Sequence, residues 1–169
     1  MIIIEKRLAG LQAAALQRFL VRARRAVGLS GAVNVLVTSS VKIRALNRAF
    51  LGKNQPTDVL SFPPDLVGAQ DAKRAAGEIA ISADIALQNA LRLGHSATDE
   101  IKILALHGLL HLAGFDHERD NGEMARMEGR LRKKLRLPEA LIERAGTSKK
   151  AVATRRRRPG SGGTARSGA

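Results

Sequence analysis

The sequence predicts one α/β (α+β) domain, a small sheet with helices around it. Short stretches rich in isoleucine and valine have the composition of strands, and the segments between and after them repeat apolar residues at helical spacing. A chain of 169 residues with 44% hydrophobic content is long enough to bury one core. Aromatic residues contribute only 2%, with no Trp or Tyr, so we expect a core of Leu, Ile, Val and Ala.

The first fifty residues predict two strands and two helices. Residues 1–5 are rich in isoleucine and end at charges, which is typical of a short strand. From residue 11 to about 27 the apolar residues recur at helical spacing, and Gly28 ends this helix. Residues 32–38 alternate valines with other residues and form the second strand. A helix follows over residues 39–50, and either of the two serines that begin it can cap its first turn.

The middle of the chain predicts two further strands. Residues 51–58 are a loop by composition, and residues 59–62 form a strand that two prolines stop. Residues 65–76 are a polar, alanine-rich excursion. Residues 77–82 form the fourth strand, and a helix follows as far as residue 93.

The last part of the chain predicts helices and then a basic tail. Thr98 fits the N-cap of a helix that carries histidines. A second helix, 121–135, becomes basic toward its end, which suits either phosphate contact or the helix carboxyl end. Residues 138–145 form a last short helix. We expect a domain over residues 1–145 and a disordered arginine-rich tail over 146–169.

The charge of the chain predicts a polyanionic partner. The formal net charge is +14, and half of it comes from the last 24 residues, which hold seven basic residues and no acid. Among soluble basic proteins, nucleic acid is a commoner partner than a membrane; a merely soluble cationic surface is the alternative. No apolar run approaches the roughly 20 residues that span a bilayer, and Ile2–Ile4 is too short for a signal peptide. We therefore expect a cytoplasmic enzyme.

Three of the four histidines fall within residues 107–117, and their spacing predicts a metal site. His107 and His111 are four residues apart, so on a helix their rings can aim at one point. Gly114 tolerates a positive φ, which permits a sharp turn that brings His117 back as a third nitrogen ligand. Three imidazoles and one open position form a catalytic zinc site, whereas structural zinc usually has four ligands with cysteines among them, and cysteine is absent here. We expect one zinc ion per chain.

The alternative is that these histidines are ordinary core or surface residues. The helix around them is apolar almost all round and is therefore expected to be buried. Two histidines buried in such a helix would each need partners for their ring nitrogens. A metal ion satisfies both rings, which favours the metal site.

The spacing His-x₃-His-x₂-Gly-x₂-His resembles the ligand pattern of the metzincin metallopeptidases. In those enzymes a glutamate follows the first histidine and acts as the general base. The corresponding residue here is Gly108. A peptidase without its base is disfavoured, so we expect the same metal geometry to serve other chemistry.

Two motifs resemble those of a bacterial family, the YbeY-type endoribonucleases or rRNA maturation factors. The family signature resembles HGxLHLxGxDH, which residues 107–117 match at every fixed position. A second segment resembles Asn-Arg-x-Tyr-Arg-Gly-Lys-x-x-Pro-Thr-Asp-Val-Leu-Ser-Phe-Pro, which residues 47–63 match with changes, and residues 77–82 resemble the family strand Gly-Asp-Ile-x-Ile-Ser. The resemblance covers about residues 1–140 and leaves the tail outside it.

This resemblance implies both a fold and a function. The implied fold is a small, mostly parallel sheet, here of four strands, with surrounding helices and a metzincin-like zinc helix. The implied function is a single-strand-specific, metal-dependent endoribonuclease that acts in maturation of the 3′ end of 16S rRNA and in late-stage 70S ribosome quality control. The implied partners are rRNA and the ribosome, with a ribosomal protein or assembly factor as a further partner and with neither DNA nor a membrane.

One departure from the family concerns the residues around the scissile phosphate. The family carries an arginine after the aromatic residue of the second motif, and this chain has Leu51 there. We hypothesise that Lys53 or Arg48 supplies the positive charge instead, although a surface lysine and a helix-end arginine are ordinary features. Asp116 adjoins the predicted ligand His117. It can orient an imidazole of the metal site, or it can cap the turn that follows the histidine helix. Glu118 is a weaker candidate for the general base.

Two other functions stay open from the sequence. One is a zinc-dependent peptidase or other hydrolase on the same scaffold, which Gly108 and the basic charge disfavour. The other is a ribosome-associated binding factor whose zinc is structural, an alternative that Leu51 keeps open.

Overall fold

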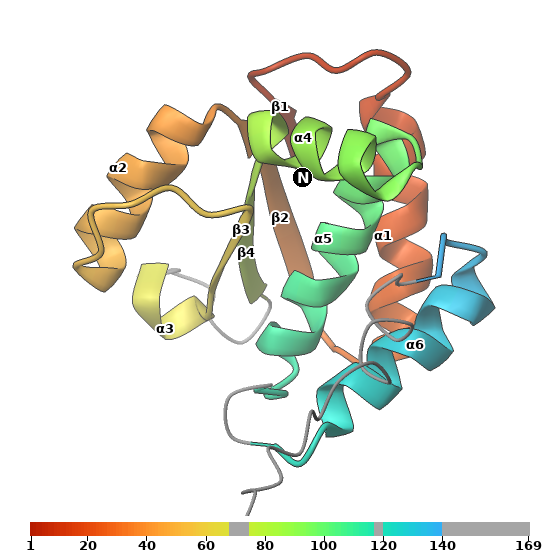
Figure 1. Ribbon diagram of the computed structural model, residues 1–169. Helices are drawn as coiled ribbons and strands as arrows, with labels where there is room; N and C mark the ends of the chain where they lie inside the picture. The colour runs from red at the N-terminus through yellow and green to blue at the C-terminus, as the bar shows by residue number, and fades with distance from the viewer. Residues whose placement is uncertain (68–74, 117–119, 140–169) are drawn as a thin grey trace, which may run out of the picture.

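A computed structural model describes residues 1–67, 75–116 and 120–139, and it shows the predicted α/β (α+β) arrangement (Figure 1). The sheet consists of β1 (Ile2–Ile4), β2 (Ala32–Thr38), β3 (Val59–Phe62) and β4 (Ala75–Ser82). The helices are α1 (Ala13–Val27), α2 (Ser40–Leu51), α3 (Pro64–Val67), α4 (Ala83–Leu93), α5 (Ala97–Leu112) and α6 (Glu123–Leu135).

The four-stranded sheet is mostly parallel, as predicted. Its order is β1-β2-β4-β3; β1 and β4 both run parallel to β2, and β3 pairs antiparallel with β4 at the edge. The register places Val35 opposite Ile79, and Val37 opposite Ile81. All four side chains are buried, because β-branched residues pack well on a pleated surface covered by helices.

Helices cover both faces of the sheet. Figure 1 shows α1 and α5 on one side of the sheet and α2 on the other. The larger core lies between the sheet and the α1–α5 layer, and its buried residues include Leu16, Phe19, Ile101, Leu106 and Leu109. A smaller core under α2 contains Ile43, Leu60, Phe62 and Ala80. As the composition predicted, aliphatic residues dominate both cores.

Helix α5 is the central helix of the domain, since it contacts α1, α4, α6, β3 and β4. Two glycines let it lie close to the sheet. A Cβ on Gly108 would lie 3.0 Å from two carbons of Ile79 and 3.1 Å from Ser61 Oγ. A Cβ on Gly77, whose φ is +133°, would lie 2.5 Å from the carbonyl oxygen of Phe62 and 2.6 Å from Leu112 Cδ2. The position of α5 against β3 and β4 therefore depends on the absence of these side chains.

Several predicted boundaries shift by a few residues. The N-cap of α5 is Ser96 rather than Thr98, because Ser96 is extended and its hydroxyl accepts a hydrogen bond from the Asp99 amide at 3.0 Å, while Thr98 already lies in the first turn. Strand β4 begins at Ala75 rather than at Gly77, and residues 64–67 form the short helix α3. The predicted helix over 138–145 lies largely outside the described residues, and the tail from 146 lies wholly outside them. No helix in the described part of the chain is both long and apolar enough to cross a membrane.

Candidate metal centre

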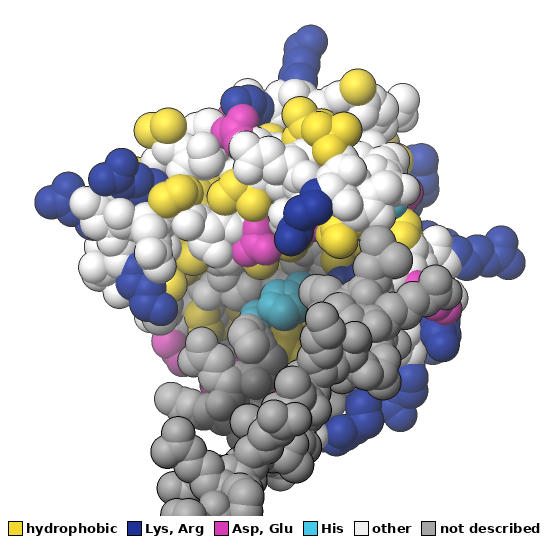
Figure 2. Space-filling view, viewed as in Figure 1, with side chains coloured by type: hydrophobic (Ala, Val, Ile, Leu, Met, Phe, Trp, Pro, Cys, Tyr) yellow, Lys and Arg dark blue, Asp and Glu magenta, His cyan; other side chains and the backbone are white. Residues whose placement is uncertain are grey.

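The rings of His107 and His111 meet on one face of α5, as their spacing predicts. Their Nε2 atoms are 3.1 Å apart, and the ring centroids are 4.8 Å apart at an interplanar angle of 76°. Two nitrogens bound to one tetrahedral zinc at about 2.0–2.1 Å lie about 3.3–3.4 Å apart, so the two rings fit a shared ion with almost no movement. Figure 2 shows histidine side chains reaching the surface at the centre of the viewed face.

A carboxylate on a neighbouring helix fixes the orientation of His107. Oε2 of Glu128, on α6, lies 2.9 Å from His107 Nδ1. An ionised carboxylate only accepts hydrogen bonds, so Nδ1 carries the proton and donates it to Glu128. The proton on Nδ1 leaves the lone pair of Nε2 directed at His111. Metal-binding histidines in proteins usually have this kind of partner on the other ring nitrogen.

Arg132 in turn holds Glu128. The guanidinium of Arg132 donates to Glu128 Oε1, from Nε at 2.9 Å and also from a terminal nitrogen, and both side chains are 14% exposed. Burial acts to raise the pKa of Glu128, but the hydrogen bond from His107 and the positive charge of Arg132 outweigh it and hold the pKa below its usual value. Glu128 is therefore ionised near neutral pH, as the proton position on His107 requires.

The chain leaves α5 by the predicted sharp turn. Gly114 has a φ of +92°, and its amide donates to the carbonyl oxygen of His111 at 3.0 Å. Asp116, partly buried, lies in a shallow pocket with Gly114, Phe115 and Asp120. The carboxylate that caps the start of α6 is that of Asp120, which accepts hydrogen bonds from the amides of residues 122–124.

The third predicted ligand, His117, and the candidate base Glu118 lie outside the described residues. Within residues 1–67, 75–116 and 120–139, no group of three or more His, Cys, Asp or Glu side chains could hold a metal ion. The described part of the site thus contains two candidate nitrogen ligands, His107 and His111, and the Glu128 carboxylate bound to His107. The role of His117 stays a prediction.

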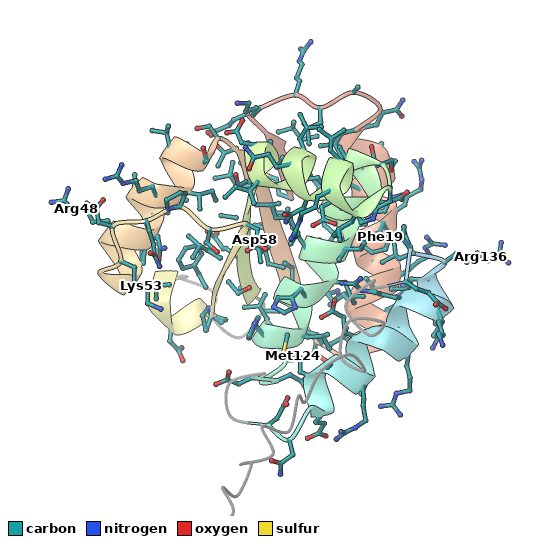
Figure 3. All side chains as sticks on the ribbon, in the orientation of Figure 1. Phe19, Arg48, Lys53, Asp58, Met124 and Arg136 are labelled. Atoms are coloured by element: carbon teal, nitrogen blue, oxygen red, sulfur yellow. The ribbon has the colours of Figure 1, made fainter. Side chains whose placement is uncertain are left out.

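The two predicted basic residues lie on the α2 side of the molecule, away from α5. Both Arg48 and Lys53 are exposed. Arg48 lines a shallow pocket with Arg44 and Asn54, and His107 does not contribute to that pocket. In Figure 3 both residues are labelled near the end of α2, with Arg48 pointing outward. The described residues do not bring either cation together with the histidine pair.

Sequence reasoning missed the residues that surround His107. Glu128 and Arg132 are an i,i+4 pair, a spacing that indicates an ion pair on a helix but not that the pair would face α5. His95 lies in the loop after α4, and its Nε2 lies 2.6 Å from Oε2 of the buried Glu100. These residues belong to one polar region on the α4–α6 side of His107.

Replacing Glu128 with alanine is expected to lower metal affinity by about 10–100-fold, the usual effect of removing the partner of a metal-binding imidazole. The physical reason is that His107 would lose the acceptor that fixes its proton and its ring. Competition with a chromogenic chelator measures the affinity. Glu123→Ala, an exposed change on the same helix, is the matched control. Equal affinities of the two variants would contradict the role given to Glu128.

Comparison with known proteins identifies the family of the chain. The sequence model of the family described as Endoribonuclease YbeY matches residues 3–137. The Endoribonuclease YbeY of Koribacter versatilis is 54% identical over 158 residues, which cover 94% of this chain and 100% of that protein. The protein of the same name from Solibacter usitatus is 44% identical over 136 residues, 80% of this chain and 88% of the relative.

A solved structure resembles the whole domain. The solution structure of TM1509 from Thermotoga maritima matches with a TM-score of 0.55 and 26% sequence identity, and the match covers 92% of this chain and 100% of that one. The family match spans both motifs, the histidine helix and the sheet strands that position it. The chain belongs to the Endoribonuclease YbeY family.

Proposed function

We propose that this protein is a zinc-dependent endoribonuclease that cuts single-stranded RNA, and that it acts in maturation of the 3′ end of 16S rRNA and in late-stage 70S ribosome quality control. The observation that carries this proposal is the pair of Nε2 atoms of His107 and His111, 3.1 Å apart and backed by Glu128, in a chain of the Endoribonuclease YbeY family. The names of the relatives support RNA as the substrate.

His107, His111 and His117 would hold the ion. A donor set of imidazoles without thiolate suits a catalytic rather than a structural zinc. Zinc would act as a Lewis acid that lowers the pKa of a bound water to about 7 and polarises a phosphoryl oxygen. The protein contributes the fixed lone pair of His107 through Glu128 and Arg132. It also exposes the site, since 27% of the His107 side chain is accessible.

The packing of Gly108 argues against the peptidase alternative. This residue occupies the position of the metzincin general base, and even a Cβ there would approach Ile79 to 3.0 Å. The position faces the sheet rather than the histidine rings, because its contacts are Ile79 of β4 and Ser61 of β3. A glutamate there would have to displace α5 from the sheet.

The charge of the chain supports an RNA partner. Figure 2 shows Lys and Arg side chains distributed mostly around the rim of the face on which the histidines are visible. Together with a formal charge of +14, this distribution suits attraction of a phosphate backbone. A cytoplasmic location and a ribosomal protein or assembly-factor partner are parts of the same proposal.

Lys53 and Arg48 remain the proposed sources of positive charge near the scissile phosphate. If Lys53 or Arg48 has this role, replacing that residue with alanine is expected to slow RNA cleavage by at least about tenfold without a matching loss of zinc affinity. The reason is that the cation would stabilise the charge that develops on the phosphate. Single-turnover cleavage assays measure the effect. Arg22→Ala, an exposed change on α1, is the control. If neither variant differs from this control, another group supplies the charge.

Removal and return of the metal test the function as a whole. Native protein is expected to cut a 16S rRNA 3′-end precursor, to lose this activity after chelation, and to regain it with one equivalent of zinc per chain. Cleavage that persists without metal would contradict the proposal. Tight rRNA binding without cleavage would favour the binding-factor alternative, and zinc-dependent hydrolysis of casein would favour the peptidase.

A further inference from the structure

A cavity of about 280 Å³ lies beside the candidate metal centre, and the mechanism above does not use it. Its wall is built by side chains of α4, α5 and α6, of the loops that precede β3 and α5, and of the segment that follows α6. His107 and Glu128 form part of this wall. The His107 ring therefore separates the cavity from the nitrogens of the candidate metal centre. In the proposed function, a group bound in the cavity would lie next to the phosphate that reacts there.

Glu100 supplies a buried carboxylate to the cavity wall. The residue is only 4% exposed. Its Oε2 lies 2.6 Å from Nε2 of His95, and the His95 side chain is 11% exposed. In the described part of the chain this is the only hydrogen bond of the Glu100 side chain, although the two oxygens of a carboxylate can accept several. A ligand with an N–H donor would use the remaining capacity of this buried acceptor.

The rest of the wall combines apolar surface with a few polar groups. Ile103 and Leu104 of α5 are buried and contribute apolar area, and Asn89 of α4 adds an amide. An apolar lining with a small number of fixed polar groups is typical of sites for small planar ligands. A nucleobase has the complementary shape, with two apolar faces and one polar edge.

The charges in the cavity argue against phosphate as its occupant. The wall contains four carboxylates, and an anion would lie against the buried Glu100. Of the two arginines, Arg132 is already bound to Glu128. Arg92 also lines the cavity, but it is exposed to solvent and donates a hydrogen bond to Asn89 Oδ1 at 3.3 Å, so both arginines already have partners.

We propose that the cavity binds one unstacked base of single-stranded RNA, adjacent to the scissile phosphate, and that Glu100 accepts a hydrogen bond from an exocyclic amino group of that base. Adenine, cytosine and guanine carry such a group, and uracil does not. The inference rests on the proposed function and adds a base preference to it. Glu100 acts here as a specificity residue, with His95 holding one of its oxygens in place.

The first test removes the amino group from the RNA and leaves the protein intact. Oligonucleotides that differ only at the nucleotide beside the cut carry adenosine, its analogue without the amino group (purine riboside), or uridine. Native holoprotein is expected to cleave the adenosine substrate about tenfold faster, in kcat/KM, than the purine riboside substrate, whose base has no N–H donor. Uridine, whose base has an N3–H donor but no amino group, is expected to lie between the two. Equal rates for adenosine and purine riboside would overturn the proposal.

The second test changes the protein. Glu100→Gln keeps the shape of the side chain, and it is expected to reduce the adenosine preference to within about threefold, because an amide is a weaker acceptor and also donates. Glu123→Gln, an exposed carboxylate on α6 that does not line the cavity, is the control and should keep the native preference. If Glu100→Gln does not fold, Asn89→Trp should fill the cavity from a partly exposed position and remove the preference. A preference that survives in a folded variant of either kind would overturn the proposal.

Binding to metal-free protein separates this inference from the proposed function. Fluorescence anisotropy with the same oligonucleotides is expected to rank adenosine above purine riboside and uridine in the native chain, and to show no ranking in Glu100→Gln. If metal-free protein shows this ranking in binding while the zinc-loaded native protein cleaves none of the oligonucleotides, the endoribonuclease proposal fails and the base site stands. If cleavage occurs without any ranking in binding or rate, the endoribonuclease proposal stands and the base site fails.

Discussion

Replacing His111 with alanine is expected to abolish RNA cleavage and to weaken metal binding by more than about 100-fold. Removing a residue that only hydrogen-bonds a metal ligand costs up to about 100-fold in affinity, and the loss of a ligand itself should cost more. The change removes one of the two nitrogens whose separation of 3.1 Å fits a single ion. Catalytic zinc usually has three protein ligands, and two would remain at most. The domain should still fold, because His111 is only partly buried at the C-terminal end of α5.

The design of this experiment depends on a matched control. The control is Lys102→Ala. Lys102 lies on the same helix, and its ammonium group pairs with Asp99 at 3.0 Å within a single helical turn. Zinc stoichiometry and cleavage of the rRNA precursor are measured on identically purified proteins. Equal cleavage by native and His111→Ala proteins would contradict the metal centre. Loss of zinc without any cleavage in the native protein would assign the ion a structural role.

The sequence was sufficient to predict those parts of the site that depend on local geometry. The helical spacing of His107 and His111 places their rings on one face whatever surrounds the helix. The turn at Gly114 follows from the freedom of glycine at positive φ, and the structure has a φ of +92° there. The strands could be located by β-branched alternation, because burial on both faces of a sheet selects such residues.

The remaining parts depend on how elements pack, and local patterns do not determine packing. Glu128 is one of two acidic residues on α6, and only the contact of α6 with α5 brings it to His107. Glu100 is one of two acidic residues in the first turn of α5, and its burial against His95 depends on the loop between α4 and α5. The exposed positions of Arg48 and Lys53 likewise follow from the side of the sheet on which α2 packs.

Gly108 connects the fold with the choice of chemistry. Gly108 lies between His107 and His111, the two candidate metal ligands on α5, yet it faces Ile79 and Ser61 on the sheet. The same helix face therefore cannot both approach the sheet this closely and carry a long acidic side chain. A glutamate at this position would therefore have to displace α5 from β3 and β4.

Gly108→Glu, which would install the metzincin base, is expected to destabilise the domain by at least about 3 kcal/mol and to produce no peptidase activity. The Cβ alone would lie 3.0 Å from Ile79, and the carboxylate would be forced into a well-packed interior without a partner. Urea unfolding measures the loss as a lower midpoint. Gly108→Ala tests the packing step alone, since Ile79 must move by only a few tenths of an ångström. Overpacking costs about 1–3 kcal/mol and the higher helix propensity of alanine offsets about 1 kcal/mol of it, so the net loss should stay below about 2 kcal/mol. A Gly108→Glu protein as stable as the native one would show that α5 can shift away from β4. The position of the histidines would then not depend on this contact. Hydrolysis of casein by that variant would show that the single residue at position 108 separates this site from a peptidase site.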